Sequence, residues 1–144
     1  MKATSFQQQI DDTKLQAAIR EAERGTSGEI RVFISRFASA DPLADGQKEF
    51  ARLGMARTPL RNAVLLYFAP ESQRFAIIGD EAIHLRCGEP FWQAVAGQME
   101  ALLRQGDING AILAGIRRTG AELAHHFPRH SGDRNDLPNT VVRN

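Results

Sequence analysis

The fold is decided by residues 61–84, RNAVLLYFAPESQRFAIIGDEAIH, which form the most apolar segment of the chain. Within it, AVLLYFA at 63–69 is continuously apolar and bounded by turn residues, which is typical of a central strand covered on both faces. PESQ predicts a short turn, and RFAIIG at 74–79 predicts a returning strand, so the pair is expected to form a β-hairpin. Arg61 and Asp80 stand at the open end of that hairpin, and their position needs an explanation.

Helical periodicity around the hairpin, together with one earlier strand, completes the predicted fold. EIRVFIS at 29–35 alternates in the manner of a half-buried strand. Helices are expected within 12–24, 39–55, 80–87, 89–105 and 106–127. In the second of these, Asp41 is the expected N-cap, and Leu43, Phe50 and Leu53 are expected to form the apolar stripe. The order predicts an α/β protein, a three-layer α/β/α sandwich with a small mixed β-sheet. A fourth short strand is left open, in 56–60 or in the tail.

The composition indicates an ordinary globular protein. The chain has 144 residues, 42% hydrophobic and 24% charged, and is predicted to be one domain over 1–144 with flexible ends at about 1–11 and 129–144. The formal net charge of +1 provides no bulk field to attract nucleic acid. Because there is no apolar signal region and no apolar run long enough to span a bilayer, we expect a cytoplasmic protein without direct membrane insertion.

Chain topology predicts that polar residues from three strands meet at one end of the sheet. The strand–helix–strand unit at 29–67 is expected to be a right-handed crossover with parallel strands. The hairpin places the third strand antiparallel to the second. Glu29 begins the first strand, Arg61 and Asn62 precede the second, and Asp80 follows the third, so all four are expected to lie close together.

Two carboxylates, a guanidinium and an amide fit a site for a divalent cation and a phosphate. Glu29 and Asp80 are the predicted metal ligands, because Mg²⁺ and Ca²⁺ prefer oxygen ligands. Arg61 and Asn62 are the predicted phosphate-binding residues, since a guanidinium forks onto phosphate oxygens. The helix after Asp80 is also expected to offer free N–H groups to an anion. A simpler interpretation stays open, in which Asp80 caps that helix and Glu29 forms a surface ion pair with Arg61.

Other titratable residues give weaker signals. His125, His126 and His130 lie close together in HHFPRH, but the proline between them interrupts any helix, so no ligand spacing on one helical face is expected. Cys87 is the one cysteine, so we expect no intrachain disulfide and no cysteine-based zinc site; we expect it to be a small buried hydrophobic residue. His84 is expected to pack beside the core, or to act as a general acid if it faces the site.

Six successive blocks carry a family resemblance that covers nearly the whole chain. They are AIREAERGTSGEIRVFI, DPLADGQKEFARLGM, TPLRNAVLLYFA, RFAIIGDEAIH, GEPFWQAV and HFP…DRNDLP. In these blocks the chain resembles the TPM domain family, in its compact stand-alone bacterial type. The resemblance implies the three-layer fold, a site for Ca²⁺ or Mg²⁺, and a phosphatase-like activity associated with the plant branch. Matched by motif, it assigns the site to Glu29 in TSGE, Arg61 and Asn62 in RN, and Asp80 in GD.

Two alanines depart from the family pattern. The family usually has glycine where this chain has Ala63 and Ala82, and alanine accepts fewer backbone conformations. These departures weigh against catalysis more than against metal binding. We therefore expect a divalent-cation-binding domain that acts as an interaction or regulatory module. The alternative is a metal-assisted phosphatase acting on phosphomonoesters. A membrane-protein partner is also expected from the resemblance, because family members often occur with membrane proteins.

Overall fold

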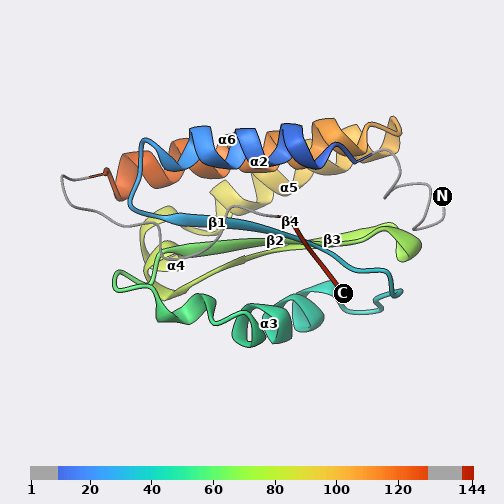
Figure 1. Ribbon diagram of the computed structural model, residues 1–144, viewed down its shortest axis with the longest axis horizontal. Coiled ribbons are helices and arrows are strands. Elements are labelled where there is room, and N and C mark those ends of the chain that lie inside the picture. Colours follow the sequence, from blue (N-terminus) through green and yellow to red (C-terminus); the bar gives the residue numbers. More distant parts are fainter. Residues whose placement is uncertain (1–9, 130–140) are drawn as a thin grey trace.

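Four strands form one mixed sheet between two layers of helices, within residues 10–129 and 141–144, which the computed structural model describes (Figure 1). The strands are β1 (Glu29–Ile34), β2 (Ala63–Ala69), β3 (Arg74–Gly79) and β4 (Val141–Arg143). The helices are α2 (Asp12–Glu23), α3 (Pro42–Arg52), α4 (Glu81–Cys87), α5 (Glu89–Arg104) and α6 (Ile108–His126), with 3₁₀ turns η1 (Met55–Arg57) and η2 (Pro70–Ser72). The predicted three-layer α/β/α sandwich is confirmed.

The strand order is β3-β2-β1-β4, and its first two pairings follow the sequence prediction. β1 and β2 are parallel, with Glu29 opposite Ala63, as a crossover through α3 requires. β2 and β3 form the antiparallel hairpin, with Val64 opposite Gly79. These two registers bring the beginning of β1, the beginning of β2 and the end of β3 to the same end of the sheet.

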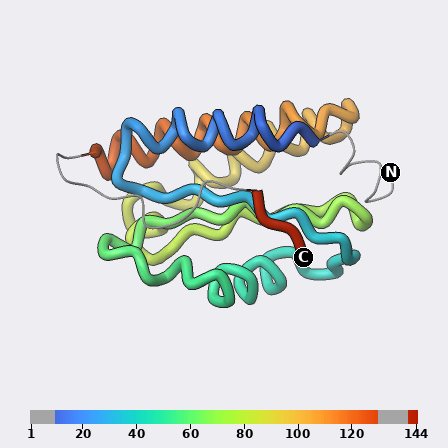
Figure 2. Tube along the Cα trace, in the orientation of Figure 1, coloured from blue at the N-terminus to red at the C-terminus, as the bar shows by residue number. Residues whose placement is uncertain are grey.

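The last strand, β4, comes from the tail that the sequence analysis expected to be flexible. Val141–Arg143 pair in parallel with β1, and Val32 lies opposite Val141 (Figure 2). Arg143 also donates from both terminal nitrogens to the two carboxylate oxygens of Asp12 at 2.7 and 2.8 Å, which ties β4 to the start of α2. Near the other end of the chain, Ile10 is buried, although it falls in the range 1–11 that was expected to be flexible.

Hydrophobic cores lie on both faces of the sheet. α2, α5 and α6 cover one face, where Val64, Leu66 and Phe68 of β2 point toward them. α3 and η1 cover the opposite face, where Leu65 and Tyr67 point. All seven residues of β2 are buried. Burial on two sides is therefore the reason that AVLLYFA is apolar without alternation.

α3 begins as predicted but contacts the sheet differently from the expected stripe. The Asp41 side chain caps it, accepting from Ala44 N at 3.1 Å. Leu43, however, is 52% exposed, so it does not belong to the packed face. The contact runs through Phe50 and the partly buried Leu53, as expected, and also through Gly46, where a Cβ would lie 3.0 Å from two Ile78 side-chain carbons. The missing side chain lets the helix lie close to β3.

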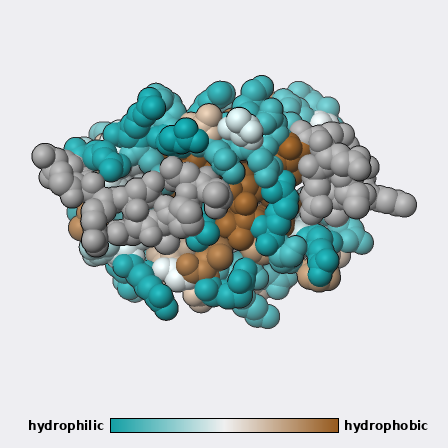
Figure 3. All heavy atoms as spheres, viewed as in Figure 1, coloured by the Kyte–Doolittle hydropathy of each residue, from teal (hydrophilic) through white to brown (hydrophobic). Residues whose placement is uncertain are grey.

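The surface over the β4 side of the sheet mixes hydrophobic and hydrophilic residues. Figure 3 shows hydrophobic atoms at the centre of this face, between hydrophilic side chains. Among the described residues, none of the helices combines the length and the apolar character needed to cross a lipid bilayer.

Candidate functional site

The two predicted metal ligands lie on one face of the sheet, on either side of Ala63. Glu29 of β1 is paired with Ala63 in parallel register, and Asp80 N donates to Ala63 O at 3.0 Å, one position beyond the hairpin pair Val64–Gly79. Paired positions project to the same face, which here is the face that α3 covers. Both carboxylates are buried, Glu29 to 2% exposure and Asp80 to 5%.

Arg61 forms a bidentate ion pair with Asp80. Its Nε donates to Asp80 Oδ2 and its Nη2 to Asp80 Oδ1, each at 2.8 Å. Glu81 Oε2 lies 3.6 Å from Arg61 Nη1 and adds a second negative charge. The hydrogen bonds with Asp80, supported by the charges of both carboxylates, raise the pKa of Arg61 above its ordinary value. Arg61, a predicted phosphate-binding residue, is therefore ion-paired with Asp80, a predicted metal ligand.

The loop before β2 holds Arg61 in a strained conformation and buries Asn62 beside it. Arg61 has a φ of 52°, a left-handed geometry that side chains rarely adopt. Its N donates to Thr58 O, and its O accepts from Ala82 N, each at 3.2 Å. Asn62 is buried; its O accepts from Glu29 N at 3.4 Å, and its Nδ2 donates to Ser27 Oγ at 3.3 Å. Asn62 thus connects the β1 and β2 segments and points toward TSGE.

Glu29 is positioned by the TSG turn before it. A Cβ at Gly28 would lie 2.9 Å from Leu123 Cδ1 and 3.2 Å from Asn62 O, so only glycine fits at this crossing. Gly28 N donates to Thr26 Oγ1 at 3.0 Å, and Ile30 N donates to the buried Glu23 carboxylate at 2.8 Å. These contacts fix the entrance to β1, and hence the carboxylate of Glu29.

The structure corrects the expectation that α4 offers free N–H groups to an anion. Asp80 Oδ1 accepts from Glu81 N at 2.8 Å, and Ala82 N is bound to Arg61 O. Ile83 N donates to Asp80 O at 3.1 Å. The first N–H groups of α4 therefore already donate hydrogen bonds within the protein. Asp80 is an N-cap, as the simpler interpretation held, and is also an ion-pair partner of Arg61.

Sequence analysis did not single out Arg31, which lies on the same face of β1 as Glu29. It is paired with Leu65 and is half-buried. Within the described parts of the chain, its Nε is buried and has no hydrogen-bond partner. Burial, with a smaller contribution from Arg52, lowers the pKa of Arg31. The signal that could have found it is the alternation Glu29-Arg31-Phe33, which places all three side chains on one face.

The donor set fits an oxygen-ligating cation. Glu29 and Asp80 provide two carboxylates in one row across the sheet, with Ala63 of β2 between them and their backbones roughly 10 Å apart. Ca²⁺ and Mg²⁺ take ligands of this kind and complete their shells with water. Arg61 competes with a cation for Asp80, because its guanidinium donates to both carboxylate oxygens of that residue. A cation can use Asp80 only after that ion pair opens.

Comparison with protein families matches residues 3–122 to the TPM domain. The chain belongs to the TPM domain family. The stretch matched contains all four predicted site residues. Comparison with curated proteins found no match.

Two solved structures share the fold of this TPM domain. The BA42 protein from the psychrophilic bacterium Bizionia argentinensis is 34% identical, with a TM-score of 0.86 and coverage of 92% of each chain. The N-terminal domain of the cg2496 protein from Corynebacterium glutamicum is 25% identical, with a TM-score of 0.61, over 80% of this chain and 74% of that one.

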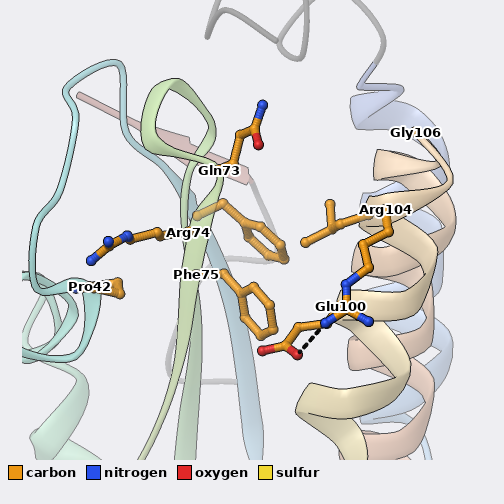
Figure 4. Close-up of a pocket in the computed structure, with 9 residues that line it drawn as sticks. Pro42, Gln73, Arg74, Phe75, Glu100, Arg104 and Gly106 are labelled. Carbon is orange, nitrogen blue, oxygen red and sulfur yellow. Dashed lines mark ion pairs between the residues drawn. The ribbon is translucent and has the colours of Figure 1, made fainter.

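A large groove of this TPM domain lies elsewhere, between β3 and α5. Its volume is about 820 Å³, and none of the four predicted site residues lines it. Phe75 points toward α5, Arg74 points to the opposite side, and Glu100 pairs with Arg104 on the helix at 3.6 Å (Figure 4). Phe68 stacks on Phe75 with ring centroids 5.7 Å apart. The groove is thus lined by both apolar and charged side chains, and it is separate from the carboxylates.

The histidines and the cysteine do not join the carboxylate site. His84 was expected to be half-buried beside the core, but it is exposed, with its ring 6.4 Å from that of Trp92. Cys87 is half-buried against the core that α6 helps to form. His125 and His126 both lie in the last turn of α6. His130, Asp133 and Asp136 fall outside the described residues.

Proposed function

We propose that this TPM domain binds a divalent cation, Ca²⁺ or Mg²⁺, through Glu29 and Asp80, and that binding makes it an interaction or regulatory module. The observation that carries the proposal is the pair of buried carboxylates held on either side of Ala63. Burying two carboxylates is costly unless positive charge balances each of them. Arg61 balances Asp80 in the cation-free protein, and a divalent cation does so more completely for both.

Cation binding is coupled to the position of Arg61. The cation displaces the guanidinium from Asp80, and Arg61, whose side chain is already 43% exposed, turns toward solvent. Leu60, beside it in the loop, is 52% exposed. Binding therefore presents a guanidinium next to an exposed apolar side chain. This pair is the surface through which a partner recognises the cation-loaded domain.

A phosphatase acting on phosphomonoesters is the second candidate, and Arg31 favours it. A guanidinium that is half-buried without a hydrogen-bonded carboxylate among the described residues is suited to an anionic ligand. With the cation held by Glu29 and Asp80, Arg31 and the released Arg61 would hold phosphate oxygens, with Asn62 beside them. The bound cation would supply charge stabilisation for the transferred phosphoryl group.

Intrinsic fluorescence and amide shifts test cation binding. Trp92 is the one tryptophan, and its Cζ2 lies 3.6 Å from where a Cβ would stand on Gly79, the residue before Asp80. Ca²⁺ and Mg²⁺ titrations up to millimolar concentrations are expected to change its emission and to shift the amides of Glu29, Arg61 and Asp80. Asp80→Asn and Glu29→Gln are expected to weaken binding at least roughly tenfold, since each removes a ligand charge.

Asp107→Asn is the matched control, because Asp107 caps α6 as Asp80 caps α4. It is expected to bind cations like the parent protein. If neither cation moves these amides in the folded parent protein, the proposal is wrong. Hydrolysis of a generic aryl phosphate tests the second candidate. Activity that Asp80→Asn and Arg31→Lys both leave unchanged belongs to a contaminant or to another site.

We extend the proposal to a membrane-protein partner, which rests on the family resemblance. Capture of solubilised membrane proteins on the immobilised domain is expected to require Ca²⁺ or Mg²⁺. It is also expected to be lost with Leu60→Ser, which leaves the ion pair of Arg61 intact. Capture that does not depend on the cation would count against the coupling described above.

A further inference from the structure

Three side chains with nitrogen, oxygen and sulfur ligand atoms converge where the end of α4 meets the end of α6. They are Cys87, Glu122 and His126, and one ligand atom from each lies within 4.8 Å of the other two. His126 Nε2 and Glu122 Oε1 are 3.8 Å apart, one helical turn from each other on α6. All three residues are half-buried. This cluster takes no part in the function proposed above.

The spacing of these atoms is close to that of a tetrahedral metal site. Zinc bonds of about 2.0–2.3 Å to imidazole, carboxylate and thiolate place the ligand atoms roughly 3.3–3.8 Å apart. The Glu122–His126 separation already falls in that range. The Cys87 sulfur has to move about 1 Å closer, which is within the reach of side-chain rotation.

The helices hold the cluster from two directions. Glu122 and His126 are i and i+4 on α6, an arrangement that turns both ligands to one side of a helix. Cys87 is the last residue of α4, and Gly88 follows with a φ of 77° that turns the chain away. The side chains of Glu122 and His126 are 22% and 23% exposed, so water can reach the fourth position.

We propose that Cys87, Glu122 and His126 bind one transition-metal ion of the zinc class, with water as the fourth ligand. A ligand set that mixes thiolate and imidazole with one carboxylate selects zinc over Ca²⁺ or Mg²⁺. On binding, the thiol loses its proton to solvent and a metal–sulfur bond forms, with no change in oxidation state. The site lies about 10 Å along α4 from Asp80, one helix length away, so it is separate from the carboxylate site.

Cobalt(II) titration of the reduced, metal-free full chain tests the proposal. Co²⁺ bound to a thiolate gives a charge-transfer band in the near ultraviolet, which is expected to saturate at one equivalent and to disappear when Zn²⁺ is added. Cys87→Ser is expected to abolish the band. His126→Gln and Glu122→Gln are expected to weaken Co²⁺ binding at least roughly tenfold. Millimolar Ca²⁺ is expected to leave the band unchanged.

His125→Gln is the matched control, because His125 is the adjacent, exposed histidine. It is expected to keep the parent affinity, and Asp80→Asn is expected to do the same whether or not the carboxylates bind a cation. Circular dichroism verifies that each variant is folded. The proposal is overturned if no band appears. It is also overturned if His126→Gln and Glu122→Gln bind Co²⁺ as the parent does, or if His125→Gln loses binding equally.

Discussion

Two glycine-to-alanine substitutions in helices are expected to change stability in opposite directions. Gly120 lies in α6 where it crosses α2, and a Cβ there would stand 2.6 Å from Ala22 Cβ and 3.4 Å from Ala22 Cα. Gly97 lies on the exposed side of α5, with no atom within 4 Å of such a Cβ. The two changes are chemically identical, so their difference isolates the packing of α2 against α6.

The magnitudes follow from these distances. Carbon atoms pack at about 3.5–4.0 Å, so Gly120→Ala must push the two helices apart by about 1 Å. Ala22 has no rotamer to relieve the clash, so the cost of overpacking falls in the upper part of its usual range, about 2–3 kcal/mol. The higher helix propensity of alanine offsets about 1 kcal/mol of this cost. We expect a net loss of about 1–2 kcal/mol for Gly120→Ala, and a gain of about 0.5–1 kcal/mol for Gly97→Ala.

Thermal and urea unfolding, followed by far-ultraviolet circular dichroism, measure both variants. For a chain of this length, 1 kcal/mol corresponds to about 3 °C in Tm. Gly120→Ala is expected to melt about 3–6 °C below the parent, and Gly97→Ala about 2–3 °C above it. If Gly120→Ala is as stable as the parent, α2 and α6 do not cross as closely as described.

Further predictions concern the candidate site and the buried thiol. Asp80→Ala is expected to lose about 1 kcal/mol more of unfolding free energy than Asp80→Asn in urea titrations, because asparagine still caps α4; the same comparison at Asp107 should give a similar difference. Gly28→Ala is expected to lose about 1–2 kcal/mol and to weaken Ca²⁺ binding, since its Cβ would meet Leu123 at 2.9 Å; unchanged values would show that the TSG turn tolerates a side chain. Burial, with a smaller contribution from Glu122, raises the pKa of the Cys87 thiol to about 11, so roughly 0.1% is thiolate at pH 8. Alkylation of the metal-free native protein by iodoacetamide is therefore expected to be at least about 100-fold slower than in urea, and to speed up about tenfold per pH unit below pH 11.

Much of the fold could be predicted because local patterns and topology rules agree. AVLLYFA has no alternation because β2 is buried on both faces, and the hairpin turn is marked by Pro70. The parallel and antiparallel registers then bring Glu29 and Asp80 to the same end of the sheet, on either side of Ala63. This convergence depends on chain direction alone, so no side-chain detail was needed.

The rest depends on contacts that a sequence pattern does not contain. β4 has three residues, too few for a periodicity, and forms because β1 offers an open edge. The ion pair between Arg61 and Asp80 depends on the left-handed backbone conformation of Arg61. Cys87 meets Glu122 only because α4 and α6 cross at their ends, so the lone cysteine gave no signal for a metal.

The pairing of β4 with β1 has a consequence for synthesis of the protein. β1 is made early, but its second neighbour comes from residues 141–143, and Val141 is synthesised 109 positions after its partner Val32. Until then the outer hydrogen-bonding groups of β1 are exposed, and such a strand can recruit a foreign strand. The nascent chain is therefore vulnerable to aggregation until residues 141–143 have emerged, and stalling shortly before residue 141 should expose this hazard most clearly.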